Sequence, residues 1–164
     1  YDAEIRKELW LGRSEGGGKR LIELYNVPSL NVRGMASARV GSGASNVVPA
    51  TANATIDMRL VKGISPEQAT ARVIQHIRQQ GYFVTDKEPD AAVRMAHPKV
   101  AWVQVREGGY RAERTSMDLP ISKLVIATTE SVRGAPVIKL PTSGGSVPIY
   151  MISEVLGTKT ISVP

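Results

Sequence analysis

The stretch 46–59, NVVPATANATIDMR, decides the fold of the central part of this chain. From Ala52 onward, apolar and polar residues alternate strictly. One face carries Ala52, Ala54, Ile56, Met58 and Leu60, and the other carries Thr51, Asn53, Thr55, Asp57 and Arg59. Because successive side chains of a strand point to opposite faces, this pattern predicts a half-buried strand with its apolar side toward a core.

Two residues of this stretch, Asn46 and Arg59, are candidates for binding a ligand. The Arg guanidinium is a planar fork of hydrogen-bond donors that matches a carboxylate. An amide and a guanidinium at the two ends of one element therefore make a carboxylate receptor. The alternative is that Arg59 is a solvated residue of the polar face, and the pattern alone leaves both interpretations open.

The neighbouring segments predict an α+β unit. Residues 29–35 form a short strand, and the Gly-, Ser- and Ala-rich stretch 36–45 forms a loop. Ser65, Pro66 and Gln68 carry the signals of a helix start, and Gly81 closes that helix. A strand over 82–85 follows. We expect an antiparallel sheet with the helix on one face.

The last third of the chain changes character. Helices are expected over 120–132 and 146–156, ending at Gly134 and Gly157, with strands over 136–140 and 159–163. This alternation predicts part of a parallel α/β sheet with crossover helices. The chain thus divides into a leading helix and loop (1–28), a lid unit (29–90), a connection (91–117) and an α/β part (118–164).

Composition narrows the function classes. The 164 residues are 42% hydrophobic and 22% charged, contain no cysteine, and show no apolar run near the ~20 residues of a membrane helix. The net charge of +6 comes from scattered Lys and Arg, and aromatic residues make up only 5%. We therefore expect no nucleic-acid partner and no membrane partner, and a cytoplasmic location.

The segment 142–146, TSGGS, lies where an expected strand ends and a helix begins. Free backbone N–H groups at such a position favour anions, and glycines let a ligand approach. The alternative assigns Ser146 as a helix N-cap and Gly144 and Gly145 as turn formers. The two histidines, His76 and His97, are isolated, so no metal site and no catalytic residue is expected within the chain.

The two motifs together resemble one known family. NVVPATANATIDMRLVKG and its capped helix resemble the lid, or dimerisation, domain of the di-zinc peptidases, and LPTSGGSVPIYMISEVLG resembles a segment of their catalytic domain. The family includes carnosinase-type dipeptidases, aminoacylases, acetylornithine deacetylase and succinyl-diaminopimelate desuccinylase. The resemblance covers roughly 29–82 and 120–164. It implies a ferredoxin-like lid whose first strand is missing from this chain.

The resemblance also implies roles for individual residues. Asn46 and Arg59 stand where the family binds the carboxylate of its substrate, often across a homodimer formed by the lid. Gly144, Gly145 and Ser146 stand where the family contacts the substrate backbone. The implied substrate is a dipeptide or an N-acyl amino acid.

The family's metal ligands and its Glu general base have no counterpart in the sequence. The two zinc ions of the parent enzyme are therefore not expected in this chain, which we expect to be an inactive slice of a longer hydrolase. The alternative is a lid-type dimerisation or binding module without hydrolysis.

Overall fold

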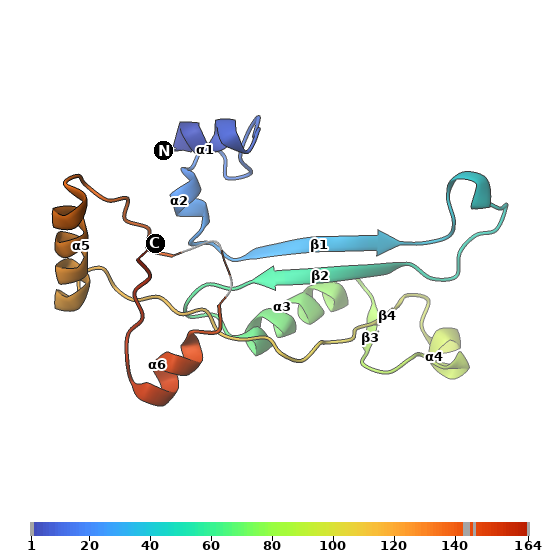
Figure 1. The fold of residues 1–164 in the computed structure, drawn as a ribbon. Helices are drawn as coiled ribbons and strands as arrows, with labels where there is room; N and C mark the ends of the chain where they lie inside the picture. The colour runs from blue at the N-terminus through green and yellow to red at the C-terminus, as the bar shows by residue number, and fades with distance from the viewer. Residues whose placement is uncertain (1, 143–144, 146, 164) are drawn as a thin grey trace.

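A computed structural model describes residues 2–142, 145 and 147–163 (Figure 1). Its helices are α1 (Asp2–Glu8), α2 (Leu21–Leu24), α3 (Pro66–Gln79), α4 (Ala91–Ala96), α5 (Pro120–Arg133) and α6 (Tyr150–Leu156), with a 3-10 turn at Gly41–Gly43. Its strands are β1 (Ser29–Ala36), β2 (Asn53–Arg59), β3 (Phe83–Thr85) and β4 (Val100–Trp102).

The central feature is a long antiparallel hairpin of β1 and β2. Leu30 lies opposite Met58 and Val32 lies opposite Ile56, so these four side chains share one face. The alternation that begins at Ala52 is thus confirmed as a strand over Asn53–Arg59. Its apolar side was predicted to face a core, but only Asp57 and Met58 of β2 are half-buried and the other residues of the strand are exposed. The hairpin projects away from the rest of the molecule, and its connecting loop forms the far tip (Figure 1).

A β-bulge keeps the apolar face of the hairpin continuous. Between Val32 and Gly34 the register shifts, so that Arg33 and Gly34 together face Thr55. Met35 then pairs with Ala54 on the apolar face. If β1 continued past Val32 without the bulge, Met35 would pair with Asn53 and lie on the polar face. A shift of one residue moves every following side chain to the other face of the sheet.

Helix α3 forms as its sequence predicts. The Ser65 hydroxyl accepts a hydrogen bond from the Gln68 backbone N–H at 3.2 Å, and the Gln68 amide oxygen accepts from the Ser65 N–H at 3.1 Å. This capping box satisfies donors that a helix start otherwise leaves open. Gly81 follows the helix with a φ of +85°. The helix lies along the base half of the hairpin and leaves the tip uncovered (Figure 1).

The second sheet differs from the prediction. Strand β3 does not join the hairpin; it pairs in parallel with β4 in a separate two-stranded sheet. The short helix α4 makes the crossover that a parallel pair requires. The Asp90 carboxylate caps α4 by accepting from the Val93 N–H at 2.8 Å, a local signal that the irregular surrounding sequence concealed.

The last third is only partly as expected. Helix α5 ends at Gly134 in the left-handed conformation, as predicted. The expected strands over 136–140 and 159–163 belong to no sheet, because neither segment meets a strand partner among the described residues. The expected helix over 146–156 begins only at Tyr150. Val147 precedes Pro148, and a residue before proline is disfavoured in the helical region.

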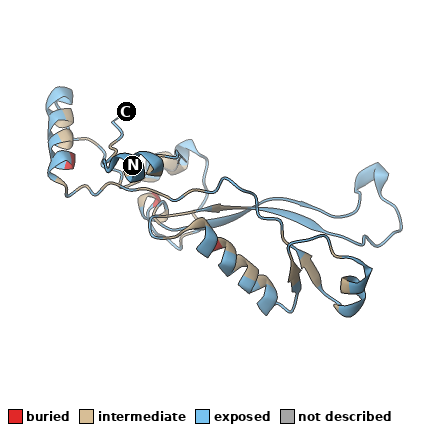
Figure 2. Ribbon diagram, turned by 90° about the horizontal axis from the view of Figure 1, so that it is seen from below, coloured by how far each residue is buried: buried red, intermediate tan, exposed pale blue. Residues whose placement is uncertain are grey.

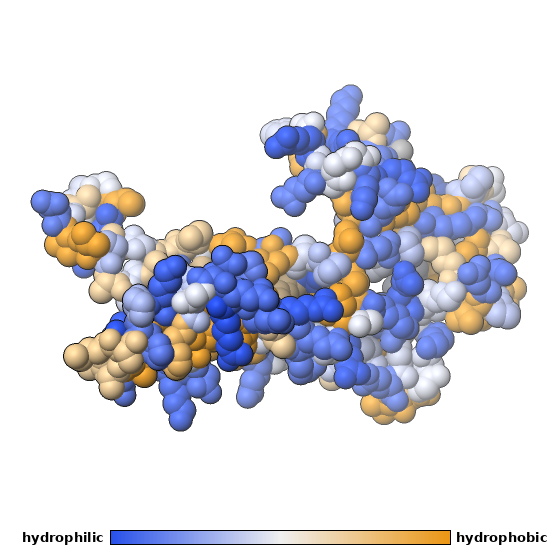
Figure 3. All heavy atoms as spheres, turned by 180° about the vertical axis from the view of Figure 1, so that it is seen from behind, coloured by the Kyte–Doolittle hydropathy of each residue, from blue (hydrophilic) through white to orange (hydrophobic). Residues whose placement is uncertain are grey.

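The described residues bury very little. Leu21 and Ala69 are their only buried hydrophobic residues, and the exposed area is 13257 Å² (Figure 2). A compact protein of 17.7 kDa exposes about 7,900 Å². Apolar side chains consequently lie open over much of the surface (Figure 3). No helix in the described part of the chain has the length and apolar character needed to traverse a bilayer.

Polar contacts fasten the base of the hairpin to the connection that follows β4. Lys62 donates to Glu113 Oε1 at 2.6 Å and to the Arg114 carbonyl at 3.2 Å. Arg114 in turn donates to Asn26 Oδ1 at 3.4 Å. Three segments far apart in sequence therefore meet at the end of β2.

Replacing Ser65 with alanine tests the helix cap. Loss of the hydroxyl leaves the Gln68 N–H without its acceptor, which costs about 1 kcal/mol of unfolding free energy. Urea denaturation followed by far-UV circular dichroism measures the change. Ser45→Ala is the matched control, because the exposed Ser45 side chain makes no hydrogen bond within the described residues. Equal stability of the two variants would show that the cap contributes nothing.

The Lys62–Glu113 pair predicts a pH-dependent contribution to stability. Lys62, followed by the Arg114 N–H, holds the pKa of Glu113 below its ordinary value of 4.5. Because the folded-state pKa is depressed, the stabilisation is present above pH 4.5 and is lost as the pH falls through the folded-state pKa.

Lys62→Met should therefore lower the unfolding free energy by about 0.2–1 kcal/mol at pH 7. The difference from the unaltered chain should shrink in acid. Lys123→Met, on the exposed face of α5, is the control and should change stability equally little at both pH values. A Lys62→Met deficit that persists unchanged at pH 3 would contradict the assignment of this pair.

Candidate functional site

A wide, open hollow lies at the base of the hairpin. Its walls come from β2, α3, the connection over 101–115, α5 and the segments on either side of α6. The polar face of β2 and the loop that contains Gly145 both line it. The fold thereby brings together the two sequence elements that were predicted to contact a ligand, although 86 residues separate Arg59 from Gly145 in the chain.

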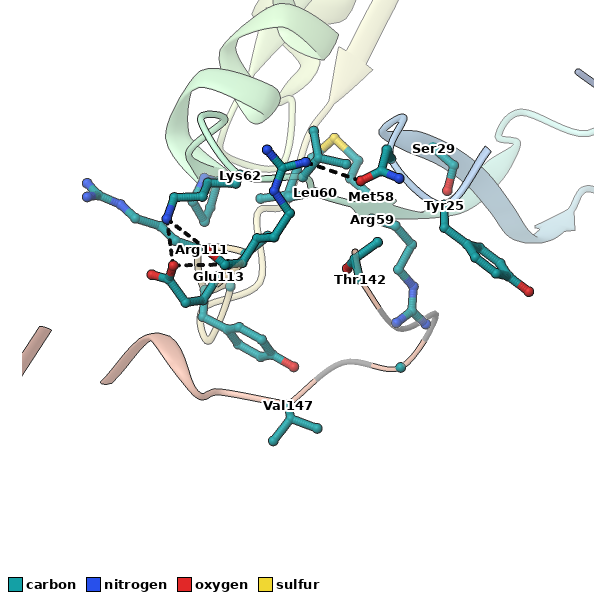
Figure 4. A pocket seen from close by; sticks show the side chains of 18 of the residues that line it. Tyr25, Ser29, Met58, Arg59, Leu60, Lys62, Arg111, Glu113, Thr142 and Val147 are labelled. Carbon is teal, nitrogen blue, oxygen red and sulfur yellow. Dashed lines mark hydrogen bonds and ion pairs between the residues drawn. The ribbon is translucent and has the colours of Figure 1, made fainter. Parts of the chain in front are cut away.

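Arg59 ends β2 on the polar face of the hairpin. Its Nε donates to Asp57 Oδ2 at 2.8 Å, and 56% of the Arg59 side chain is exposed against 30% for Asp57. Figure 4 shows the Arg59 side chain extending from the strand toward the segment that carries Thr142. The Arg59 guanidinium therefore lies at the hollow, and the Asp57 carboxylate holds its Nε side.

The Gly-Gly-Ser turn is described only in part. Gly145 is exposed and lines the hollow, and a Cβ added there would meet nothing within 4 Å. Gly144 and Ser146 lie outside the described residues. The N-cap of α6 is Ile149, which provides no side-chain hydrogen bond. With only seven residues in α6, its first turn offers no strong anion site.

Asn46 lies far from Arg59 within one chain. It is an exposed residue of the loop at the hairpin tip, and it does not line the hollow. The whole of β2 separates the two residues, and seven residues of strand span about 20 Å. A single chain thus does not assemble the amide and the guanidinium into one receptor.

Sequence reasoning missed the partner of Arg59. Asp57 was assigned only to the polar face, yet it is the carboxylate that holds the guanidinium. The available signal was the spacing, because residues two apart on a strand share a face and an Asp-x-Arg pair can meet there. Arg33 was also missed; as the extra residue of the bulge, it lines the hollow from β1.

The described residues do not fit a metal site. They contain no group of three His, Asp or Glu side chains close enough to hold an ion. His76 is an exposed residue of α3. The His97 ring stacks on Phe83, with ring centres 3.9 Å apart, and neither residue lines the hollow. What the site offers chemically is the Arg59 guanidinium and the exposed backbone of Gly145, both at the hollow.

Comparison with known proteins agrees with this geometry. Residues 21–84, which contain the hairpin, α3 and the start of β3, match the family described as the peptidase dimerisation domain. No match is found among curated proteins. Among solved structures, the chain is similar to an M20 family metallo-carboxypeptidase, Sso-CP2, from Sulfolobus solfataricus.

The likeness to Sso-CP2 has a TM-score of 0.65 at 23% sequence identity, and it covers 96% of this chain. At this identity, the comparison concerns the fold. The chain spans 37% of the length of Sso-CP2, so it corresponds to a part of that protein. Residues 21–84 thus match the peptidase dimerisation domain, and the chain shares its fold with part of an M20 family metallo-carboxypeptidase.

Proposed function

We propose that this chain supplies the carboxylate-binding strand and the dimerisation surface of a metallopeptidase that hydrolyses amide bonds in dipeptides or N-acyl amino acids. The observation that carries the proposal is the position of Arg59. It ends a stiff strand, is held by Asp57 at 2.8 Å, and lies at the same hollow as Gly145.

The chemistry of Arg59 suits a substrate carboxylate. A guanidinium donates two parallel hydrogen bonds to the two oxygens of a carboxylate, and such charge-assisted bonds are the strong ones. Dipeptides and N-acyl amino acids both carry this group next to the amide bond that is cleaved. The accessible backbone at Gly145 suits contacts to that amide.

We propose that groups outside this chain carry out the hydrolytic step. The described residues contain no group of three His, Asp or Glu side chains placed to hold a metal ion. We expect the two zinc ions and the general base to come from other parts of a longer protein, and the 164-residue chain alone to be inactive. The alternative function is a lid-type module that dimerises or binds without hydrolysis. The match of residues 21–84 to the dimerisation domain alone favours it.

Distance within the hairpin supports a role for the dimer in the site. Asn46 is too far from Arg59 to join it on the same ligand within one chain. A second copy could bring its own Asn46 to this hollow, because the tip projects well beyond the body (Figure 1). We therefore propose that Asn46 serves the site of the partner subunit, with Gly144, Gly145 and Ser146 lining the cleft of its own chain.

Arg59→Ala, made in the longer protein, tests carboxylate binding. Loss of a charged hydrogen bond costs about 1.5–3 kcal/mol, so kcat/KM for dipeptides should fall about 10- to 150-fold. The same substrates with a C-terminal carboxamide should be almost unaffected. Arg72→Ala is the matched control, since Arg72 is an exposed residue of α3 outside the hollow. Unchanged kinetics in Arg59→Ala would remove this residue from the site.

A second experiment tests the dimer. The apolar face of the hairpin is open toward the tip, where Val32 and Met35 are 55% and 77% exposed. A homodimer that covers this face should dissociate in Met35→Glu, because burying a charge there is costly. Light scattering after size exclusion measures the mass. Met95→Glu, on the exposed surface of α4, should remain dimeric. A monomeric unaltered protein would contradict dimerisation itself.

A further inference from the structure

We infer that Asp57 is a positioning residue that sets the direction in which Arg59 presents its guanidinium. The inference rests on the proposed function, because it concerns how Arg59 meets a substrate carboxylate. Asp57 touches neither the substrate nor any reacting group in this assignment. It acts through Arg59 alone.

The geometry of the pair fixes which edge of the guanidinium is held. Asp57 and Arg59 are two residues apart on β2, so their side chains leave the same face of the strand about 7 Å apart. The bond at 2.8 Å runs from Nε of Arg59 to Oδ2 of Asp57. This hydrogen bond holds the Nε side of the guanidinium against Asp57. The side formed by the two Nη atoms is therefore directed away from Asp57.

Burial distinguishes the holding group from the held one. Asp57 is the less exposed partner, at 30% of its side chain, and Arg59 is 56% exposed. The less exposed Asp57 carboxylate therefore holds the Nε end of the longer and more exposed Arg59 side chain. Arg loses considerable rotamer freedom when it binds, and a contact that restricts it beforehand reduces this cost.

The surroundings of Asp57 leave Arg59 as its ionic partner. Across the hairpin, Asn31 lies opposite Asp57 and Ser29 lies opposite Arg59, and both are neutral. Asn31 donates to the Ser29 hydroxyl at 3.2 Å. Within the described part of the chain, Arg59 is the one cation paired with Asp57. Asn31 and Ser29 thus bond to each other, and the Asp57 carboxylate bonds to the Arg59 guanidinium.

Two effects of Asp57 oppose each other. Its negative charge weakens the attraction between Arg59 and a carboxylate, and its contact orients the guanidinium. Both side chains are partly exposed, so solvent and salt screen the charge effect. Orientation is not screened. We therefore expect the orienting effect to be the larger one, and removal of Asp57 to weaken substrate binding.

The test uses Asp57→Asn in the longer protein, with steady-state kinetics on a dipeptide and on its C-terminal carboxamide. Asparagine keeps the shape of the side chain but replaces the charged acceptor of the Arg59 Nε–H with a neutral amide oxygen, which holds the guanidinium less strongly. KM for the dipeptide should rise about 10-fold with little change in kcat. KM for the carboxamide should stay the same. Asp57→Glu, which restores the charge, should recover part of the dipeptide affinity.

Asp86→Asn is the matched control, because it makes the same change of carboxylate to amide at an exposed residue that does not line the hollow. It should leave KM for both substrates unchanged. A merely structural role for Asp57 would lower kcat and stability along with affinity, and it would affect the dipeptide and the carboxamide equally. That result would overturn the inference.

The double variant, Asp57→Asn with Arg59→Ala, separates the inference from the proposed function. If Asp57 acts through Arg59, the double variant should bind the dipeptide no more weakly than Arg59→Ala alone. Additive losses would overturn the inference and leave the role of Arg59 intact. An Arg59→Ala variant with unchanged dipeptide kinetics would overturn both.

Discussion

The register between β1 and β2 is the constraint on which the rest of this structure depends. It places Leu30, Val32 and Met35 on one face with Ala54, Ile56 and Met58. Asp57 and Arg59 lie two residues apart on β2 and share the opposite face. The pairing thus separates an apolar face of the hairpin from the polar face that carries the candidate site.

The molecule owes little of its shape to a core of its own. Most apolar residues of α5 and α6 remain exposed. The last third is attached by a hydrogen bond from Thr115 to the Thr160 carbonyl at 2.6 Å, by an ion pair of Arg111 with Glu154 at 3.9 Å, and by stacking of Tyr110 on Tyr150. Exposed ion pairs contribute little stability in water, so these contacts hold the last third weakly.

Local signals in the sequence predicted local structure well. The alternation that begins at Ala52, the Ser65 cap and the glycine stop at Gly134 each act within a few residues, and each is confirmed. Signals that depend on a distant partner did not suffice. In the part of the chain that the structure describes, the strands expected over 136–140 and 159–163 have no strand to pair with, and the strand at Phe83–Thr85 joins β4 instead of the hairpin. A strand is defined by its partner, which the segment itself does not specify.

The candidate site shows the same division. Alternation alone predicted that Arg59 lies on the polar face. Only the family resemblance predicted that Arg59 and the Gly145 loop belong to one site. The wide separation of Asn46 and Arg59 within one chain could be estimated from residue count, but the orientation of the guanidinium could not. It depends on a side-chain contact with Asp57 that no periodicity encodes.

The bulge at Arg33 and Gly34 has a mechanical meaning beyond its role in pairing. It lies between the base of the hairpin, which carries Asp57 and Arg59, and the tip, which carries Asn46. A two-stranded ribbon twists more freely than a wide sheet, and a bulge adds to that twist. The inserted residue therefore adds twist between base and tip, while the strands stay paired on both sides of the bulge.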